Sequence, residues 1–159
     1  MTDEQRRHWL RQAVGLAVEN VRSRRGGPFG AIIVQRGQII ATGVNLVTST
    51  NDPTAHAEVV AIRAACHELG TFQLPGCDIY LSCEPCPMCL GALYWARPKS
   101  FYYAATRHNA AQAGFDDDFI YRELLLAPGK RSIPGHRLGI DSESKPFEEW
   151  ARSLEKVRY

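Results

Sequence analysis

The sequence lacks features that would place it in several other classes of protein. No apolar run approaches the roughly 18 residues of a membrane-spanning helix. The first residues, Met1 to Arg7, are charged and lack the apolar segment of a secretory signal. The net charge is only +2, which argues against the broad basic surface of a nucleic-acid-binding protein. We therefore expect a cytoplasmic protein without membrane or nucleic-acid partners.

The sequence contains few cysteines, and their number is odd. Five cysteines without framework spacing fit a reducing compartment better than a disulfide-rich secreted domain. Cys83, Cys86 and Cys89 are evenly spaced, but an iron–sulfur run of this kind needs a fourth Cys, and position 93 is Leu. A second Cys-x-x-Cys that would close a four-thiolate site is also missing from the sequence. A redox pair or half of a structural zinc site remains the alternative for Cys86 and Cys89.

Two short segments together describe a metal site. His56-Ala57-Glu58 supplies an imidazole and a carboxylate, and Pro85-Cys86-Pro87-Met88-Cys89 supplies two thiolates. Three protein ligands leave one position of a tetrahedral Zn²⁺ open, which is typical of catalytic sites. Glu58 is not needed as a ligand and is free to move protons. The pattern is the H-x-E…P-C-x-x-C signature of zinc-dependent nucleobase deaminases.

Periodicity predicts one mixed α/β domain over residues 1–159. A capping box at Thr2–Gln5 begins a first helix that ends near the basic residues Arg22–Arg25. Further helices are predicted at residues 53–69, 86–95, 118–125 and 146–157, with Asp52 as the N-cap of the first of these. Strands are predicted at residues 30–35, 39–44, 79–82, 101–104 and, weakly, 137–140, the first two forming a hairpin.

This order of elements brings the metal ligands together. His56 and Glu58 are expected in the first turn of the second helix, and Cys86 and Cys89 at the start of the third. Side chains three apart share a helix face, so both thiolates can reach one ion. Strand-to-helix junctions of one sheet meet where open α/β sheets bind ligands. We therefore expect the site at one edge of the sheet.

The chain resembles the cytidine deaminase-like superfamily over nearly its whole length, and within it the bacterial guanine deaminase branch. The branch rests on residues 27–31, Asn45 with residues 48–55, residues 92–98, residues 113–117 and Tyr159. The resemblance implies an α/β fold, a three-layer α/β/α sandwich around a central five-stranded mixed sheet. It also implies a homodimer in which a C-terminal segment, about residues 141–159, is exchanged.

The resemblance assigns roles to individual residues. His56, Cys86 and Cys89 match the ligands of one Zn²⁺ per chain, and Glu58 matches the proton shuttle. The substrate contacts that it implies are Asn45 for a hydrogen bond to the purine, Phe29 and Trp95 for aromatic walls, Ala57 beside the metal ligand, Asp117 for N–H groups of the base, and Tyr159 as a lid. The register of the acidic position among Asp116, Asp117 and Asp118 is open, and helix capping or core packing is the alternative for several of these residues.

The expected activity is hydrolysis of the free base guanine to xanthine and ammonia, in purine salvage or breakdown. A tRNA adenosine deaminase and a cytosine deaminase are the enzymatic alternatives, because all three share the zinc motif. A zinc-stabilised structural or binding module is the non-enzymatic alternative. Glu58 argues against the last, because a structural site needs no acid at that spacing.

Overall fold

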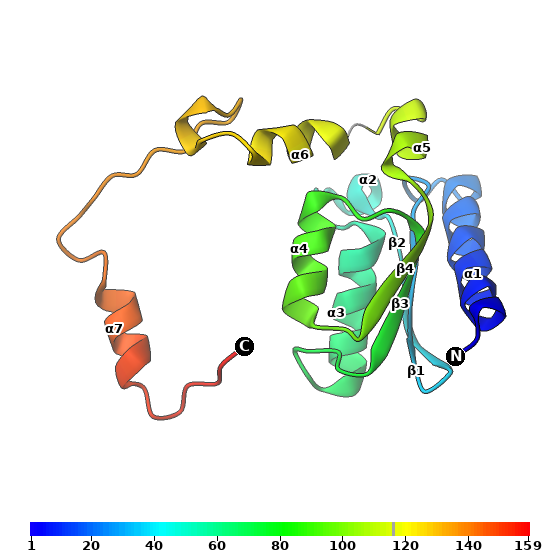
Figure 1. Cartoon of the computed structure of the whole chain (residues 1–159), viewed down its shortest axis with the longest axis horizontal. Coiled ribbons are helices and arrows are strands. Elements are labelled where there is room, and N and C mark those ends of the chain that lie inside the picture. The colour runs from blue at the N-terminus through cyan, green and yellow to red at the C-terminus, as the bar shows by residue number, and fades with distance from the viewer. Residues whose placement is uncertain (116) are drawn as a thin grey trace. The chain divides into compact units, whose positions relative to one another are not determined.

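The computed structural model describes residues 1–115 and 117–159. The chain divides into two compact units, residues 1–118 and residues 119–159 (Figure 1). The first unit contains α1 (Asp3–Arg22), β1 (Gly30–Gln35), β2 (Gln38–Val44), α2 (Val47–Thr50), α3 (Ala57–Leu69), β3 (Cys77–Cys83), α4 (Pro87–Ala96), β4 (Ser100–Ala105) and α5 (Arg107–Gln112). Helix α6 (Asp117–Leu124) crosses the boundary, and the second unit continues with the 3₁₀ turn η1 (Pro128–Lys130) and α7 (Lys145–Arg152).

The first unit is built on a mixed sheet of order β2-β1-β3-β4. Strand β1 runs antiparallel to both β2 and β3, while β3 and β4 are parallel. Strands β2, β3 and β4 therefore point the same way. Their carboxyl ends and the beginning of β1 lie at one edge of the sheet.

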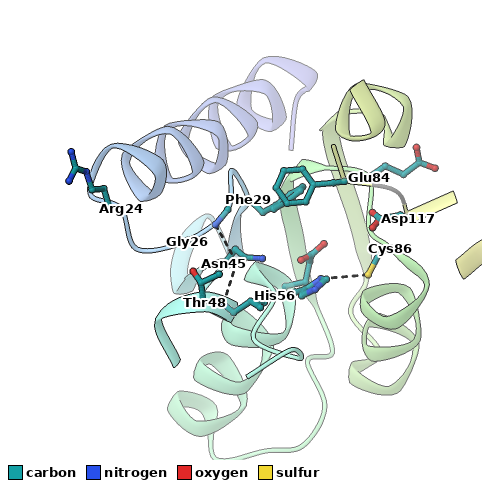
Figure 2. A pocket seen from close by; sticks show the side chains of 13 residues that line it. Arg24, Gly26, Phe29, Asn45, Thr48, His56, Glu84, Cys86 and Asp117 are labelled. Carbon is teal, nitrogen blue, oxygen red and sulfur yellow. Dashed lines mark hydrogen bonds between the residues drawn. The ribbon is translucent and has the colours of Figure 1, made fainter. Parts of the chain in front are cut away.

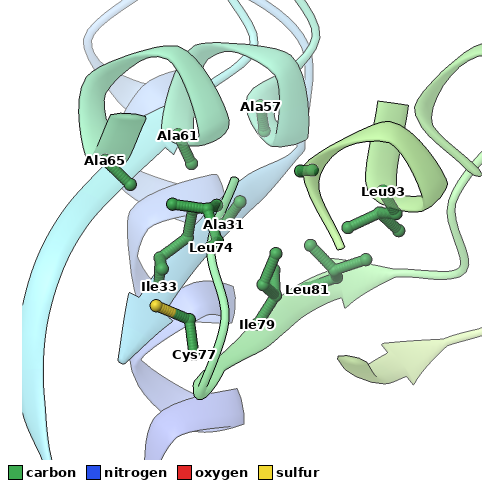
Figure 3. Packing of buried hydrophobic residues seen from close by; sticks show 11 residues of the cluster. Ala31, Ile33, Ala57, Ala61, Ala65, Leu74, Cys77, Ile79, Leu81 and Leu93 are labelled. Carbon is green, nitrogen blue, oxygen red and sulfur yellow. The ribbon is translucent and has the colours of Figure 1, made fainter. Parts of the chain in front are cut away.

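Side chains alternate between the two faces of the sheet, as the strand period of two requires. On one face, Ile33 and Ile79 pack against the alanines of α3 and against Leu93 of α4 (Figure 3). On the other face, Ile32 and Tyr80 pack against α1. Helices thus cover both faces, and the three-layer α/β/α arrangement is confirmed for the first unit.

Helix boundaries follow local sequence signals. The predicted capping box is present, because Thr2 Oγ1 accepts from the Gln5 N–H and Gln5 Oε1 accepts from the Thr2 N–H. Helix α3 ends at Gly70 with a positive φ of 61°, a conformation that glycine adopts without steric cost. A second capping box at Thr106 and Asn109 begins α5, a helix that the periodicity analysis missed because it is short.

The predicted start of the second helix is wrong. Asp52 does not cap a helix; its Oδ1 accepts from the Thr54 N–H and hydroxyl at 2.8 and 2.7 Å. This side-chain turn competes with helix formation. Helix α3 begins only after His56, and the short α2 precedes the turn.

The fifth strand is also wrong: the sheet has four strands among the described residues, and residues 137–140 are irregular. Gly139 gives that segment no side chain to pack, and Leu138 and Ile140 on either side are exposed. The last helix ends at Arg152, earlier than predicted. In the second unit none of residues 119–159 is buried. Among the described helices, none has the length and apolarity needed to cross a membrane.

Glycine at position 43 allows α3 to lie close to β2. A Cβ there would be 2.2 Å from the Ala57 carbonyl oxygen and 2.6 Å from the Ala61 nitrogen. We predict that Gly43→Ala lowers the free energy of unfolding by about 1–3 kcal/mol, since helix and strand must separate. Denaturant unfolding at a fixed zinc concentration measures this.

The matched control is Gly15→Ala in α1, where nothing lies within 4 Å of the added methyl group. Alanine restricts the unfolded chain and favours helix, so this variant should gain about 0.5–1 kcal/mol. Equal unfolding midpoints for Gly43→Ala and the unsubstituted protein would contradict the close packing of α3 on β2.

Candidate active site

The site forms at the sheet edge where the carboxyl ends of β2, β3 and β4 meet. Asn45 follows β2, Cys86 follows β3, and the segment after β4 and α5 leads to Phe115 and Asp117. Phe29 immediately precedes β1, which begins at the same edge. The predicted convergence of strand-to-helix junctions is therefore confirmed, with three strand ends and one strand beginning contributing.

The metal-ligating residues stand at the starts of two helices. His56 is the N-cap of α3, and Cys86 is the N-cap of α4, both with extended backbone. Pro87 occupies the first turn of α4, where the absence of its N–H costs no hydrogen bond. Cys89 lies in the first turn of α4 and is fully buried. Helix starts favour negatively charged ligands such as thiolates.

The donor atoms have the spacing that zinc requires. His56 Nδ1 lies 3.6 Å from Cys86 Sγ and 3.5 Å from Cys89 Sγ, and all three donor atoms fall within 4.8 Å of one another (Figure 2). Tetrahedral zinc, with bonds of about 2.3 Å to sulfur and about 2.0 Å to nitrogen, separates such atoms by about 3.6 Å. One imidazole and two thiolates fit one zinc ion with a fourth position free.

The two sulfur atoms and the imidazole of the site shift one another's pKa values. Interaction with the Cys89 thiol and with His56 lowers the pKa of Cys86 to about 4, although burial acts against it. The hydrogen bond to Cys86 raises the pKa of His56. The pKa of Cys89 is raised by the same Cys86 sulfur and by burial. Two adjacent sulfurs cannot both ionise easily without a cation between them.

Glu58 lies two residues after His56, in the first turn of α3, and lines the same cavity. Only 8% of the residue is exposed. Burial raises the pKa of its carboxyl group, because a carboxylate loses its hydration there. A buried carboxyl group beside a candidate metal site, with a raised pKa, is suited to take up and release protons.

The cavity has a volume of about 480 Å³, within the usual range for small-molecule sites. Of the residues predicted from the sequence, its lining includes Phe29, Asn45, His56, Glu58, Cys86 and Asp117. These side chains surround one space in Figure 2, which labels all of them except Glu58. Phe29 packs edge-on against Phe115, with ring centroids 4.9 Å apart, and the two rings form an apolar wall.

Asn45 presents a hydrogen-bond donor to this cavity. Its Oδ1 accepts from the backbone N–H groups of Gly27 and Val47, each at 3.3 Å. The Nδ2 group has no partner within the part of the chain that the structure describes. Two donors therefore hold the oxygen of this buried amide, and the NH₂ group is left for a ligand.

Other predicted substrate contacts lie elsewhere. Trp95 is on α4, is 64% exposed and is absent from the lining of this cavity. Ala57 is the first residue of α3 and is buried in the core. Tyr159 belongs to the second unit and is exposed. Asp118 does not line the cavity, and Asp116 lies outside the described residues.

Sequence reasoning missed several lining residues. Glu84 lines the cavity and holds the start of α5, its Oε2 accepting from the Arg107 N–H at 3.0 Å. Its position directly before Pro85-Cys86 was the available signal. Phe115 lies in the segment 113–117 used for the resemblance, but no pattern showed that it faces Phe29. Val47 and Thr48 line the cavity from the unpredicted helix α2.

Comparison with known families decides between a catalytic zinc site and the alternatives of a redox pair or a structural zinc site. The profile described as the cytidine and deoxycytidylate deaminase zinc-binding region matches residues 3–105. The chain belongs to the cytidine and deoxycytidylate deaminase family. Zinc is the metal of this family, and the donor atoms of His56, Cys86 and Cys89 are placed so that they could hold one ion per chain.

Individual relatives of the deaminase differ in substrate. Guanine deaminase from Bacillus subtilis (strain 168) is 54% identical over 151 residues, covering 95% of this chain and 97% of the relative. A tRNA-specific adenosine deaminase from Agrobacterium fabrum (strain C58 / ATCC 33970) is 41% identical over 101 residues, covering 64% of this chain and 66% of the relative.

Solved structures of guanine deaminases match the fold. The X-ray structure of the Bacillus subtilis enzyme has a TM-score of 0.95 and 53% identity, covering 100% of this chain and 99% of that one. The guanine deaminase of Nitrosomonas europaea has a TM-score of 0.65 and 34% identity, covering 69% of this chain and 63% of that one. The cytidine deaminase-like α/β fold is thereby confirmed.

The ligand assignment predicts different results for two neighbouring cysteines. Cys89→Ala should lose bound zinc and, with it, part of the thermal stability, because the ion joins the starts of α3 and α4. Elemental analysis after gel filtration and a melting curve measure both.

Cys83→Ala is the control. This buried thiol donates to the Thr106 carbonyl at 3.5 Å, and burial raises its pKa to about 11, so it stays protonated. It should keep close to one zinc per chain. If Cys83→Ala lost zinc as completely as Cys89→Ala, the ligand set would be wrong.

Proposed function

We propose that this deaminase hydrolyses the free base guanine to xanthine and ammonia, as a step of purine salvage or breakdown in the cytoplasm. The observation that carries the proposal is the cavity itself. A three-ligand zinc site, a buried acid beside it and polar groups of opposite hydrogen-bonding character face one space of about 480 Å³. Near-complete coverage by a guanine deaminase relative supports guanine over the other bases of the family.

The polar groups of the cavity complement guanine. Asn45 offers an NH₂ donor, which suits the oxo and ring-nitrogen acceptors of the base. Asp117 offers a carboxylate to the same cavity, which suits the N–H groups of the base. Phe29 and Phe115 supply an apolar wall for the planar ring. A site built to hydrogen-bond its substrate rejects analogues that leave its buried groups unpaired.

The chemistry divides between metal and protein. Zinc at the His56, Cys86 and Cys89 site supplies the acidity that makes water nucleophilic near neutral pH. Glu58 takes the proton of the attacking water and delivers it to ring N3 as the new C–O bond forms at C2. The same carboxyl group then takes the remaining proton from the new hydroxyl group at C2 and delivers it to the exocyclic amine. The C2–N bond breaks, ammonia leaves, and xanthine remains.

Glu58→Gln tests the proton shuttle. The amide keeps the size of the side chain and cannot accept the water proton, so turnover of guanine should fall at least about a hundredfold. Bound zinc should stay at one per chain. The measurement is ammonia release with elemental analysis, and Glu68→Gln, an exposed position on the same helix, is the control expected to keep full turnover.

The same ammonia assay separates the substrates. Guanine, cytosine, adenine and a tRNA anticodon stem are compared with the unsubstituted protein. Release from cytosine or from the RNA stem, without release from guanine, would reassign the enzyme. Zinc binding without release from any of the four would leave only a structural module.

The proposed enzyme is a homodimer that exchanges its C-terminal segment, about residues 141–159. Support comes from the second unit, which leaves Phe147 and Trp150 of α7 exposed at helical spacing and Leu154 exposed just beyond the end of that helix. An apolar stripe of this kind is covered in a stable protein by another surface. We propose that the surface is the partner subunit, and that Tyr159 and the residues before it close the partner's cavity against water.

Deleting residues 156–159 tests this closure. The truncated chain should stay folded and zinc-loaded, with guanine turnover reduced sharply. Mixing it with Glu58→Gln chains should recover some activity if segments are exchanged. One site of the mixed dimer then combines an intact Glu58 with the intact tail of its partner.

Dimer exchange is verified by mass spectrometry of differently tagged chains. Full activity of the truncated protein would contradict the proposal that the tail closes the cavity. Verified mixing without any recovery would assign the tail to its own chain.

A further inference from the structure

Asn20 is a buried polar residue that the proposed chemistry does not use. It lies in the last turn and a half of α1 and is only 2% exposed. Its side chain does not reach the cavity lining. A buried amide is kept only where hydrogen bonds compensate for its lost hydration, so its partners indicate its role.

Both partners of Asn20 belong to the rim of the cavity. Its Nδ2 donates to the Gly27 carbonyl at 2.9 Å and to the Asn45 carbonyl at 2.8 Å. Because both partners are acceptors, the amide can have only this orientation, with the nitrogen toward the rim. Its Oδ1 is buried without a hydrogen-bond partner among the described residues. The two donor bonds are thus retained although the other end of the amide goes unsatisfied.

These bonds close a network around the side chain of Asn45. Asn20 donates to the carbonyl of Gly27, and the N–H of Gly27 donates to Asn45 Oδ1. Asn20 also holds the backbone of Asn45 directly. Glycine at position 26 permits the approach, since a Cβ there would lie 2.1 Å from the Asn45 carbonyl oxygen. Figure 2 shows Asn45 between the Gly26 loop and His56.

We propose that Asn20 is a positioning residue for substrate recognition: it fixes the loop that orients the Asn45 amide, so that the NH₂ group and not the oxygen faces the base. The inference rests on the proposed function only in naming guanine as the base. Without Asn20 the Gly27 loop loses its anchor to α1. The Asn45 amide then samples several orientations, and the cavity loses its fixed donor.

A double-mutant cycle tests the coupling. Asn20→Ala should lower kcat/KM for guanine by about tenfold to a hundredfold, the scale of a slightly misplaced binding group. In an Asn45→Ala background the same substitution should change kcat/KM by less than about twofold, since the side chain through which it acts is absent. Equal losses in both backgrounds would show a general structural role and overturn the proposal.

Ala17→Gly is the matched control, one turn earlier on α1 and also buried. It weakens the helix without touching the network, so it should lower the melting temperature and leave kcat/KM nearly unchanged. A loss of kcat/KM as large as that of Asn20→Ala would overturn the proposal. If Asn20→Ala does not fold, Asn20→Ser, which keeps one donor, takes its place in the cycle with the same expected pattern.

A spectroscopic readout separates this inference from the proposed function. The ¹⁵N side-chain resonances of Asn45, assigned by their loss in Asn45→Ala, should be sharp in the unsubstituted protein and in Ala17→Gly. In Asn20→Ala they should broaden or move toward free-amide shifts. An unchanged Asn45 signal would overturn the proposal. Inactivity of the unsubstituted protein on guanine would overturn only the assigned substrate.

Discussion

The direction of the strands is the constraint on which the site depends. Because β1 is antiparallel to its neighbours and the other three strands are parallel, four chain segments distant in sequence reach one sheet edge. The proposed recognition groups come from the segments around Gly27, Asn45 and Phe115, and the proposed metal ligands come from the starts of α3 and α4. A reversal of any one strand would carry its group to the opposite edge of the molecule.

Burial gives neighbouring acidic groups different roles. Glu58 is withdrawn from water, and its carboxyl group holds a proton more readily than an exposed one. Glu84, half-buried in the same cavity, has an oxygen engaged by the start of α5. The first arrangement suits proton movement, whereas the second fixes a backbone segment. Two glutamates in one cavity thus have surroundings suited to different roles, proton movement for Glu58 and anchoring of the backbone for Glu84.

Much of this was accessible from sequence because the signals were local. The capping box at Thr2, the apolar runs of β1 and β3, and the spacing of Cys86 and Cys89 each depend on neighbours in the chain. The start of α3 was misjudged because Asp52 can cap either a helix or a tight turn. Only the folded structure shows that Asp52 accepts from the N–H of Thr54 and so caps the turn.

Contacts between distant segments were not accessible from sequence. The facing of Phe29 and Phe115 and the anchoring of Asn45 by Asn20 join residues from different elements. No periodicity specifies such pairs. The exposed position of Trp95 shows the converse, since an aromatic residue inside a recognised motif need not line the cavity of the chain that carries it.

The N-caps of α3 and α4 carry a consequence for how this protein can evolve. Both positions are filled by proposed metal ligands, His56 and Cys86, and neither side chain caps its helix with a hydrogen bond. Serine or aspartate there would stabilise the helix start by about 1 kcal/mol but would remove a ligand. Substitutions that improve the N-cap therefore cannot raise the thermal stability of these two helices without loss of a metal ligand. Selection for higher thermal stability must act on residues remote from the ion, or on the affinity of the site for the ion.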